Sequence, residues 1–151
     1  MTLEIMFESL MMQGTKIDNL WSMYIVVQLG VFWFFFLLHR PLLIVERLIA
    51  LLAYTLFTFI NGSALVNSYL FLEALRADTV NTFRAQLENA PFVYQALVLS
   101  DFTERPNLIF MTHGGALVFV VLILLFRNSM ISYYYKSFPP TQTGAGQIAV
   151  D

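Results

Sequence analysis

The chain has 151 residues, of which 58% are hydrophobic and only 12% are charged. Soluble domains carry about 25% charged residues, and a soluble protein of this length has too little interior to hide so much apolar surface, so the composition points to an integral membrane protein. The net charge of −2 lacks the basic excess of a nucleic-acid-binding protein. The absence of cysteine excludes disulfides, thiol catalysis, iron–sulfur clusters and cysteine-ligated zinc.

Residues 1–14 predict a short amphipathic helix that lies in the membrane interface. Glu4 and Glu8 fall off a helical face that collects the apolar side chains of Leu3, Met6, Phe7, Leu10 and Met11. The alternative is a frayed N-terminal tail. No basic residue precedes the first apolar block, so we expect no cleaved signal peptide.

Three apolar segments are long enough to cross a bilayer, and they cover residues 20–38, 48–70 and 108–126. Each approaches the ~20 residues that a helix needs to cross ~30 Å of hydrocarbon. The predicted fold is therefore an all-α integral membrane protein with three transmembrane helices in a single domain, residues 1–151. We expect Pro41 in the first turn of the second helix and Pro106 at the start of the third, because a missing N–H costs nothing there.

One face of the second predicted transmembrane helix is polar. On a wheel of about 100° per residue, five side chains fall within roughly a quadrant. These residues, called the polar stripe below, are Arg47, Tyr54, Thr58, Asn61 and Ser68. Small and weakly polar residues of this kind mediate contacts between membrane helices, so we expect the stripe to face another helix. The alternative is that several copies close into a ring and the stripe lines a water-filled pore.

Two amides lie near the middle of predicted spans. Gln28 belongs to the first span and Asn61 to the second, and each is expensive in hydrocarbon without a partner. We expect them to hydrogen-bond to each other, within one chain or between copies. No acidic or basic side chain lies at the middle of a predicted span, which argues against proton transport.

The segment 71–105 predicts a helical link outside the membrane. Leu72, Val80, Phe83 and Leu87 recur at helical spacing among charged residues, so the second helix is expected to extend beyond the bilayer as an amphipathic helix. The sequence Asn-Ala-Pro at positions 89–91 should end it. The apolar piece 92–100 is too short to span, and it either rests on the membrane or packs on the extension.

The third span contains His113 followed by Gly114 and Gly115. Glycines inside membrane helices usually mark a close helix approach, so we expect a packing notch at these glycines with His113 hydrogen-bonded beside it. A pH-sensing role for His113 is the alternative. His39 is expected at the opposite membrane surface, so the two histidines predict no haem site, and we expect neither a cofactor nor a metal ion.

Residues 127–151 are expected to form a cytoplasmic tail. The tail begins with an interfacial anchor of three aromatic rings and one ammonium group, Tyr133, Tyr134, Tyr135 and Lys136. Basic residues outnumber acidic ones in this tail and in the link between the first two spans, and the reverse holds in the other two segments outside the membrane. The positive-inside rule therefore predicts an external N-terminus and a cytoplasmic C-terminus, here in a bacterial plasma membrane.

Together these patterns predict a small non-enzymatic membrane protein that acts as an assembling subunit. It would assemble through the polar stripe, either with copies of itself or as an accessory subunit of a larger membrane complex. A homo-oligomeric channel with the stripe lining its lumen is the alternative. The sequence has no Walker loop, H-E-x-x-H motif or paired carboxylates that would indicate an enzyme. The expected partners are the lipid bilayer and membrane proteins, not nucleic acid.

Overall fold

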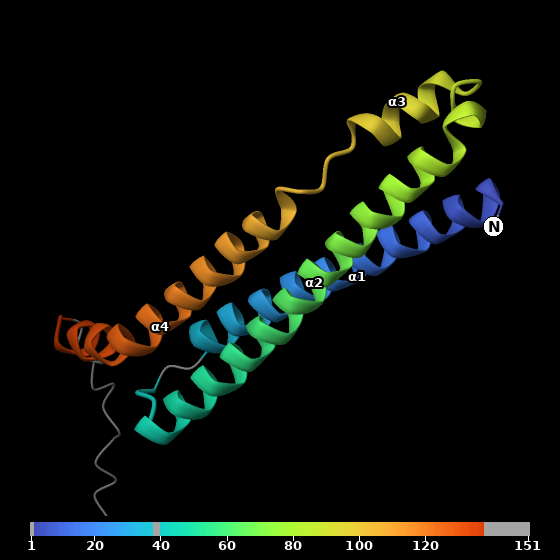
Figure 1. Cartoon of the computed structure of the whole chain (residues 1–151). Helices are drawn as coiled ribbons and strands as arrows, with labels where there is room; N and C mark the ends of the chain where they lie inside the picture. Colours follow the sequence, from blue (N-terminus) through green and yellow to red (C-terminus); the bar gives the residue numbers. More distant parts are fainter. Residues whose placement is uncertain (1, 38–39, 138–151) are drawn as a thin grey trace, which may run out of the picture.

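The computed structural model describes residues 2–37 and 40–137, and the regular secondary structure in these ranges is entirely helical (Figure 1). The helices are α1 (Leu3–Leu37), α2 (Ile44–Leu87), α3 (Pro91–Leu99) and α4 (Arg105–Ser137). Within the described residues, three helices, α1, α2 and α4, are long and apolar enough to cross a membrane. The chain is therefore an all-helical, multi-pass membrane protein.

The central helix of the molecule is α2, and the other three helices pack against it. Both α1 and α4 run antiparallel to α2 (Figure 1). No Cα atom of α1 comes within 8 Å of a Cα atom of α4 in these described helices. Contacts between α1 and α4 are therefore made by long side chains that reach across the space between the two backbones.

The length of α2 exceeds what a bilayer requires. Its 44 residues extend about 66 Å, against ~30 Å of hydrocarbon. The uncharged stretch from Leu48 to Leu72 suits lipid, and Glu73, Arg76 and Asp78 follow it directly. The helix continues past these charged residues and ends at Leu87, just before the Asn-Ala-Pro sequence.

The N-terminal helix expected over residues 1–14 is not a separate element. It is the first part of α1, which continues without a break to Leu37, because no proline interrupts residues 3–37 and a single glycine costs a helix only about 1 kcal/mol. One side of this part packs on protein, since Met6 is buried and Gln13 Nε2 donates to Ser68 O at 3.0 Å.

Prolines set the boundaries of the helices, although not always where the sequence suggested. Pro41 was expected in the first turn of the second helix, but α2 begins at Ile44, where Glu46 Oε2 accepts a hydrogen bond from Leu43 N–H at 2.9 Å. Pro91 opens α3 and keeps Ala90 out of the helical region (φ −125°, ψ 69°). Pro106 is the second residue of α4, as expected.

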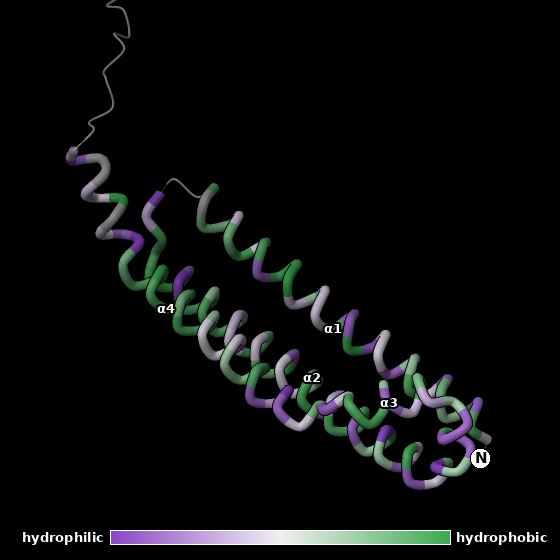
Figure 2. Tube along the Cα trace, turned by 90° about the horizontal axis from the view of Figure 1, so that it is seen from above, coloured by the Kyte–Doolittle hydropathy of each residue, from purple (hydrophilic) through white to green (hydrophobic). Residues whose placement is uncertain are grey.

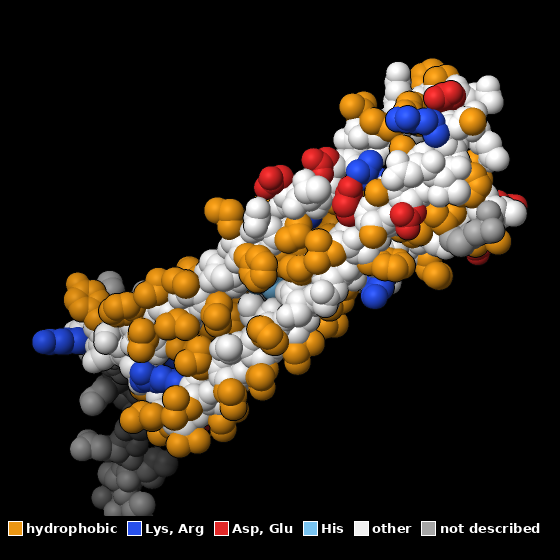
Figure 3. Space-filling view, viewed as in Figure 1, with side chains coloured by type: hydrophobic (Ala, Val, Ile, Leu, Met, Phe, Trp, Pro, Cys, Tyr) orange, Lys and Arg blue, Asp and Glu red, His pale blue; other side chains and the backbone are white. Residues whose placement is uncertain are grey.

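The buried apolar side chains form two clusters between α2 and its neighbours. One contains Ile17, Leu65, Leu72 and Ile109, and the other contains Leu42, Tyr54, Val120 and Leu124. Most of the other large apolar side chains are exposed, as a lipid-facing surface requires. The carboxylates visible in Figure 3 gather on the half of the molecule that contains α3, and Figure 2 shows hydrophilic residues concentrated toward that same end.

Candidate functional site: a polar cluster around Asn61 and His113

The polar stripe faces the interior of a single chain. Tyr54, Thr58, Asn61 and Ser68 are buried, and Arg47 is partly exposed. Hydrogen bonds to the stripe come from α1 and α4 and from the linker between α1 and α2. Arg47, Tyr54 and Asn61 therefore have side-chain partners before any second copy is added.

The most connected member of the stripe is Asn61, which is only 1% exposed. Its Nδ2 donates to Leu20 O on α1 at 3.2 Å, which turns Oδ1 toward His113 Nε2 on α4 at 3.0 Å. Both ring nitrogens of His113 face acceptor oxygens, and a neutral imidazole donates from only one of them. The other ring nitrogen of His113, Nδ1, lies 3.1 Å from Ile109 O. One amide thus ties the three long helices together.

Aromatic side chains complete the cluster on the α1 side. The rings of Tyr24 and His113 stack with their centroids 4.1 Å apart and an interplanar angle of 26°, and Tyr24 Oη donates to Thr112 O at 3.2 Å. Trp21 lies 5.8 Å from the same imidazole and donates from Nε1 to Tyr69 Oη at 3.2 Å. These contacts link α1 to α4 where their backbones lie apart.

The glycine that accommodates His113 is Gly62 on α2, and not one of the two glycines that follow the histidine. A Cβ atom on Gly62 would lie 3.4 Å from His113 Cδ2. A Cβ on Gly114 or Gly115 would meet nothing within 4 Å, so these two glycines form no packing notch within the chain. They lie on an exposed side of α4, whereas His113 points inward and is 4% exposed.

The expected pairing of Gln28 with Asn61 does not occur within the chain. Gln28 Nε2 donates to Tyr54 Oη at 2.5 Å, while Asn61 bonds to Leu20 and His113. Because α1 and α2 run antiparallel, Gln28 lies level with Tyr54, and Asn61 lies level with Leu20, about two turns away. Among the described residues, Thr58 Oγ1 is a buried side-chain oxygen without a hydrogen-bond partner.

Sequence reasoning singled out Gln28 of α1, which bonds to Tyr54 of the stripe, but it missed most of the residues that α1 buries. The buried residues of α1 are Met6, Gln13, Ile17 and Tyr24. They contain the seven-residue spacings 6 to 13 and 17 to 24, which match the spacing 47, 54, 61 and 68 of the stripe. A heptad analysis of both helices together would have identified them.

The expected anchor at the end of α4 is described only in part. Tyr133 and Lys136 are exposed in the last turns of the helix. Tyr134 and Tyr135 also belong to α4, but their side chains lie outside the described residues, as do His39 and the tail after Ser137. The anchor therefore stays a prediction.

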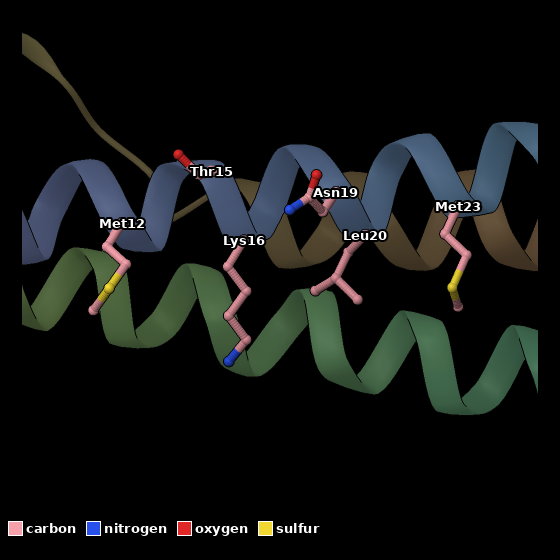
Figure 4. A pocket seen from close by; sticks show the side chains of 6 residues that line it. All are labelled: Met12, Thr15, Lys16, Asn19, Leu20 and Met23. Carbon is pink, nitrogen blue, oxygen red and sulfur yellow. The ribbon is translucent and has the colours of Figure 1, made fainter.

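Outside this cluster, a surface groove and the possible metal ligands remain to be described. A shallow, open groove follows α1, where Met12, Lys16, Leu20 and Met23 point toward α2 and Thr15 points away (Figure 4). Within the described residues, no three side chains of His, Cys, Asp or Glu come together in a way that would hold a metal ion.

Comparison with models of known protein families, with curated proteins and with solved structures finds no match to this chain.

Proposed function

We propose that this protein is a non-enzymatic membrane subunit that assembles with copies of itself or with another membrane protein. In this proposal the contact is made by the part of the molecule that extends beyond the bilayer. We call this the projecting part, and it comprises residues 3–13 of α1, residues 69–87 of α2, and α3.

The depth of the bilayer follows from where charges appear along α2. From Arg47 to Ser68 the helix rises about 32 Å, which matches the ~30 Å of a hydrocarbon core. Glu46 and Arg47 stand at one end of this stretch, and Glu73 and Arg76 follow the other end. The projecting part then lies on the water side of the membrane.

The observation that carries the proposal is the exposure of α3. This helix has no charged residue and yet leaves Phe92 87% exposed and Leu99 79% exposed, with Val93 and Val98 also exposed. Large apolar side chains that gather on a surface outside lipid usually mark a protein contact. Arg76 fixes α3 in place, because its Nη1 donates to Leu97 O at 2.9 Å.

The burial of the polar stripe argues against the channel alternative. Thr58, Asn61 and Ser68 are each less than a tenth exposed inside one chain, so a lumen lined by them would require α1 or α4 to leave α2. The same burial argues that assembly does not use the stripe. The geometry therefore favours the projecting part as the contact.

Orientation and location belong to the same proposal. The described end formed by the α1–α2 linker and the last turns of α4 holds Arg40, Arg47, Arg127 and Lys136 against Glu46. By the positive-inside rule this end faces the cytoplasm, and the projecting part faces outward. We propose a bacterial plasma membrane as the setting.

A photo-crosslinking amino acid placed at position 92 or 99 tests the proposal in native membranes. We expect adducts of discrete mass at both positions and none at Lys16, an exposed residue of α1 outside the projecting part. Native mass spectrometry of the purified protein then distinguishes a homo-oligomer from a mixed complex. The Phe92→Ser/Leu99→Ser variant should lose the partner, while Lys16→Ser should keep it.

The proposal is wrong if the wild-type protein gives no crosslink at either position and has the mass of a single chain. If Asn61→Leu abolishes assembly while the α3 variant does not, the polar stripe is the contact and the projecting part is not.

A further inference from the structure

The groove along α1 has room for an elongated ligand. Its volume is about 490 Å³, and small-ligand sites have volumes of about 300–1,000 Å³. The residues that line it extend from Met12 to Met23, which is about 16 Å of helix. A ligand that fills this groove is therefore long rather than compact.

Lys16 places a positive charge in this groove, and its side chain reaches from α1 toward α2 (Figure 4). Lys16 makes no side-chain hydrogen bond or ion pair with the described residues. Asp18 is the nearest carboxylate in sequence, but residues two apart on a helix do not face each other. The stretch of α2 from Leu48 to Leu72 has no charged side chain. The groove therefore offers a cation to an anionic ligand.

Two hydrogen bonds fix the height of Lys16 against α2. Gln13 Nε2 donates to Ser68 O at 3.0 Å. One turn further along α1 than Lys16, Leu20 O accepts from Asn61 Nδ2 at 3.2 Å. Lys16 thus lies about 4.5 Å along the helix axis from the level of Ser68, which is the outer end of the hydrocarbon core in the position proposed above. A lysine at this depth extends its ammonium group to the lipid phosphates while its methylene groups stay in hydrocarbon.

The middle of the groove is polar and its inner end is apolar. Lys16 and Asn19 line the middle, and the Asn19 side chain also makes no hydrogen bond with the described residues. Leu20 and Met23 line the end that lies deeper in the membrane, and Val26, 66% exposed, continues this apolar surface. An anion beside Lys16 therefore has an apolar channel leading away from it toward the middle of the bilayer, which suits a phosphate that carries acyl chains.

We propose that this groove binds an anionic phospholipid of the outer leaflet, with the lipid phosphate at the Lys16 ammonium group and an acyl chain along Leu20 and Met23. A lysine ammonium is a compact charge with three N–H donors, and the Asn19 amide adds neutral donors one turn away. The charge selects an anionic headgroup, and the apolar end selects an attached acyl chain. The site rests on the proposed position of the bilayer and not on assembly through α3.

Native mass spectrometry of the delipidated protein in detergent, with phosphatidylglycerol or phosphatidylcholine added, measures the preference directly. We expect phosphatidylglycerol to bind more tightly to the wild-type protein. Lys16→Gln should weaken phosphatidylglycerol binding about fivefold, which corresponds to about 1 kcal/mol for one basic residue near a lipid surface. Because Lys16 is exposed and makes no bond within the described chain, the fold should tolerate the substitution.

Two matched variants separate the groove from a general attraction between basic residues and lipid. Lys16→Arg keeps the charge and should retain most of the preference. Arg105→Gln removes an exposed arginine at the start of α4, outside the groove, and should leave the preference unchanged. The proposal is overturned if the wild-type protein binds the two lipids equally well, or if Arg105→Gln weakens phosphatidylglycerol as much as Lys16→Gln does.

Inorganic phosphate distinguishes a soluble anion from a lipid headgroup. We expect phosphate to leave the thermal unfolding of the detergent-solubilised protein unchanged. Phosphatidylglycerol at the same concentration should raise the unfolding temperature of the wild-type protein more than that of Lys16→Gln. Equal stabilisation by phosphate and phosphatidylglycerol would assign Lys16 to a soluble anion and would overturn the lipid site.

Discussion

The two halves of the molecule differ in the kind of side chain that the central helix α2 exposes. Between Arg47 and Ser68, α2 buries Tyr54, Thr58, Asn61 and Ser68, and it exposes most of its large apolar side chains. Beyond Ser68, charged residues such as Glu73, Arg76 and Asp78 appear on its surface. In the proposed membrane position the first half is surrounded by lipid and the second by water, and the kind of side chain that α2 exposes changes between them.

This difference changes what holds each half together. In lipid, an exposed leucine costs nothing, so association of the helices depends on close packing and on polar contacts such as the Asn61–His113 pair. In water, each Å² of exposed apolar surface costs about 25 cal/mol, which makes the uncovered face of α3 unfavourable for an isolated chain. Substitutions should therefore act through polar contacts in the first half and through apolar contacts and ion pairs in the second.

The largest effect is expected from Asn61→Leu. The substitution removes the partner of the buried His113 Nε2 and the additional donor to Leu20 O, a carbonyl in the interior of α1. An unsatisfied buried polar group costs about 1–3 kcal/mol, so we expect a loss of about 2 kcal/mol in the free energy of unfolding. Thermal or steric-trapping unfolding in detergent micelles measures this loss.

Thr58→Val is the matched control, one turn away on the same face. Thr58 Oγ1 has no hydrogen-bond partner among the described residues, so its replacement by an isosteric methyl group should be neutral or stabilising. A double-mutant cycle of Asn61→Leu with His113→Leu should give a coupling energy of about 0.6–1.7 kcal/mol. Equal losses from Thr58→Val and Asn61→Leu would mean that the amide has no special role.

The next largest loss of stability is expected from a substitution at Gly62 but not at Gly114, although the sequence alone does not distinguish these two glycines. Gly62→Leu should destabilise the protein by about 1–3 kcal/mol through overpacking, because the space beside it is filled by the His113 ring at 3.4 Å. Gly114→Leu should be tolerated, since nothing lies within 4 Å of a Cβ there. The unfolding temperatures of the two variants check this difference, and a large loss from Gly114→Leu would reveal a contact outside the single chain.

The polar stripe could be recognised from sequence because its spacing lies within one helix. A heptad of polar residues in an apolar run requires burial regardless of what covers it, so Tyr54, Asn61 and Ser68 were identifiable as facing inward. The partners were not identifiable, because they depend on the vertical register of α1 and α4 against α2. That register places Leu20 and His113, rather than Gln28, opposite Asn61.

Some helix boundaries could also be predicted from the sequence, and others could not. The end of α2 at Leu87 and the start of α4 near Pro106 follow from local backbone restrictions, which a sequence states directly. The continuity of α1 through residues 14–20 was missed, because a change in polarity along a helix resembles a break between two helices. A helix that leaves lipid for water shows that same change without any break.

In the projecting part, Arg76→Ala should release α3 from α2. The substitution removes the ion pair with Glu73 and the bond from Nη1 to Leu97 O. Because these groups are partly exposed to water, we expect a loss of only about 1 kcal/mol. Amide hydrogen exchange in residues 91–99 should accelerate, whereas Arg84→Ala, at an exposed arginine of the same helix, should leave it unchanged. Faster exchange in both variants would contradict the assignment of Arg76 as the attachment point.

The smallest effect should come from the turn that precedes α4. Asp101 accepts hydrogen bonds from Thr103 Oγ1 at 2.7 Å and from Thr103 N–H at 2.8 Å. These bonds, the side-chain bond foremost, hold the pKa of the Asp101 carboxyl below its usual value of 3.8. A carboxyl whose folded-state pKa is lowered stabilises the turn above its unfolded pKa, and this contribution disappears as the pH falls through the folded value.

Titration of the Thr103 amide signal by NMR in detergent measures this transition. In the wild-type protein we expect a midpoint below pH 3.8, with the turn intact at every pH above that value. Asp101→Asn keeps an acceptor oxygen without a titrating proton, so its Thr103 signal should not change over the same range. A midpoint at or above pH 3.8 would mean that Thr103 does not favour the charged carboxylate. The turn before α4 would then lack this polar contact, and its order would depend on the packing of Phe102 against Tyr69.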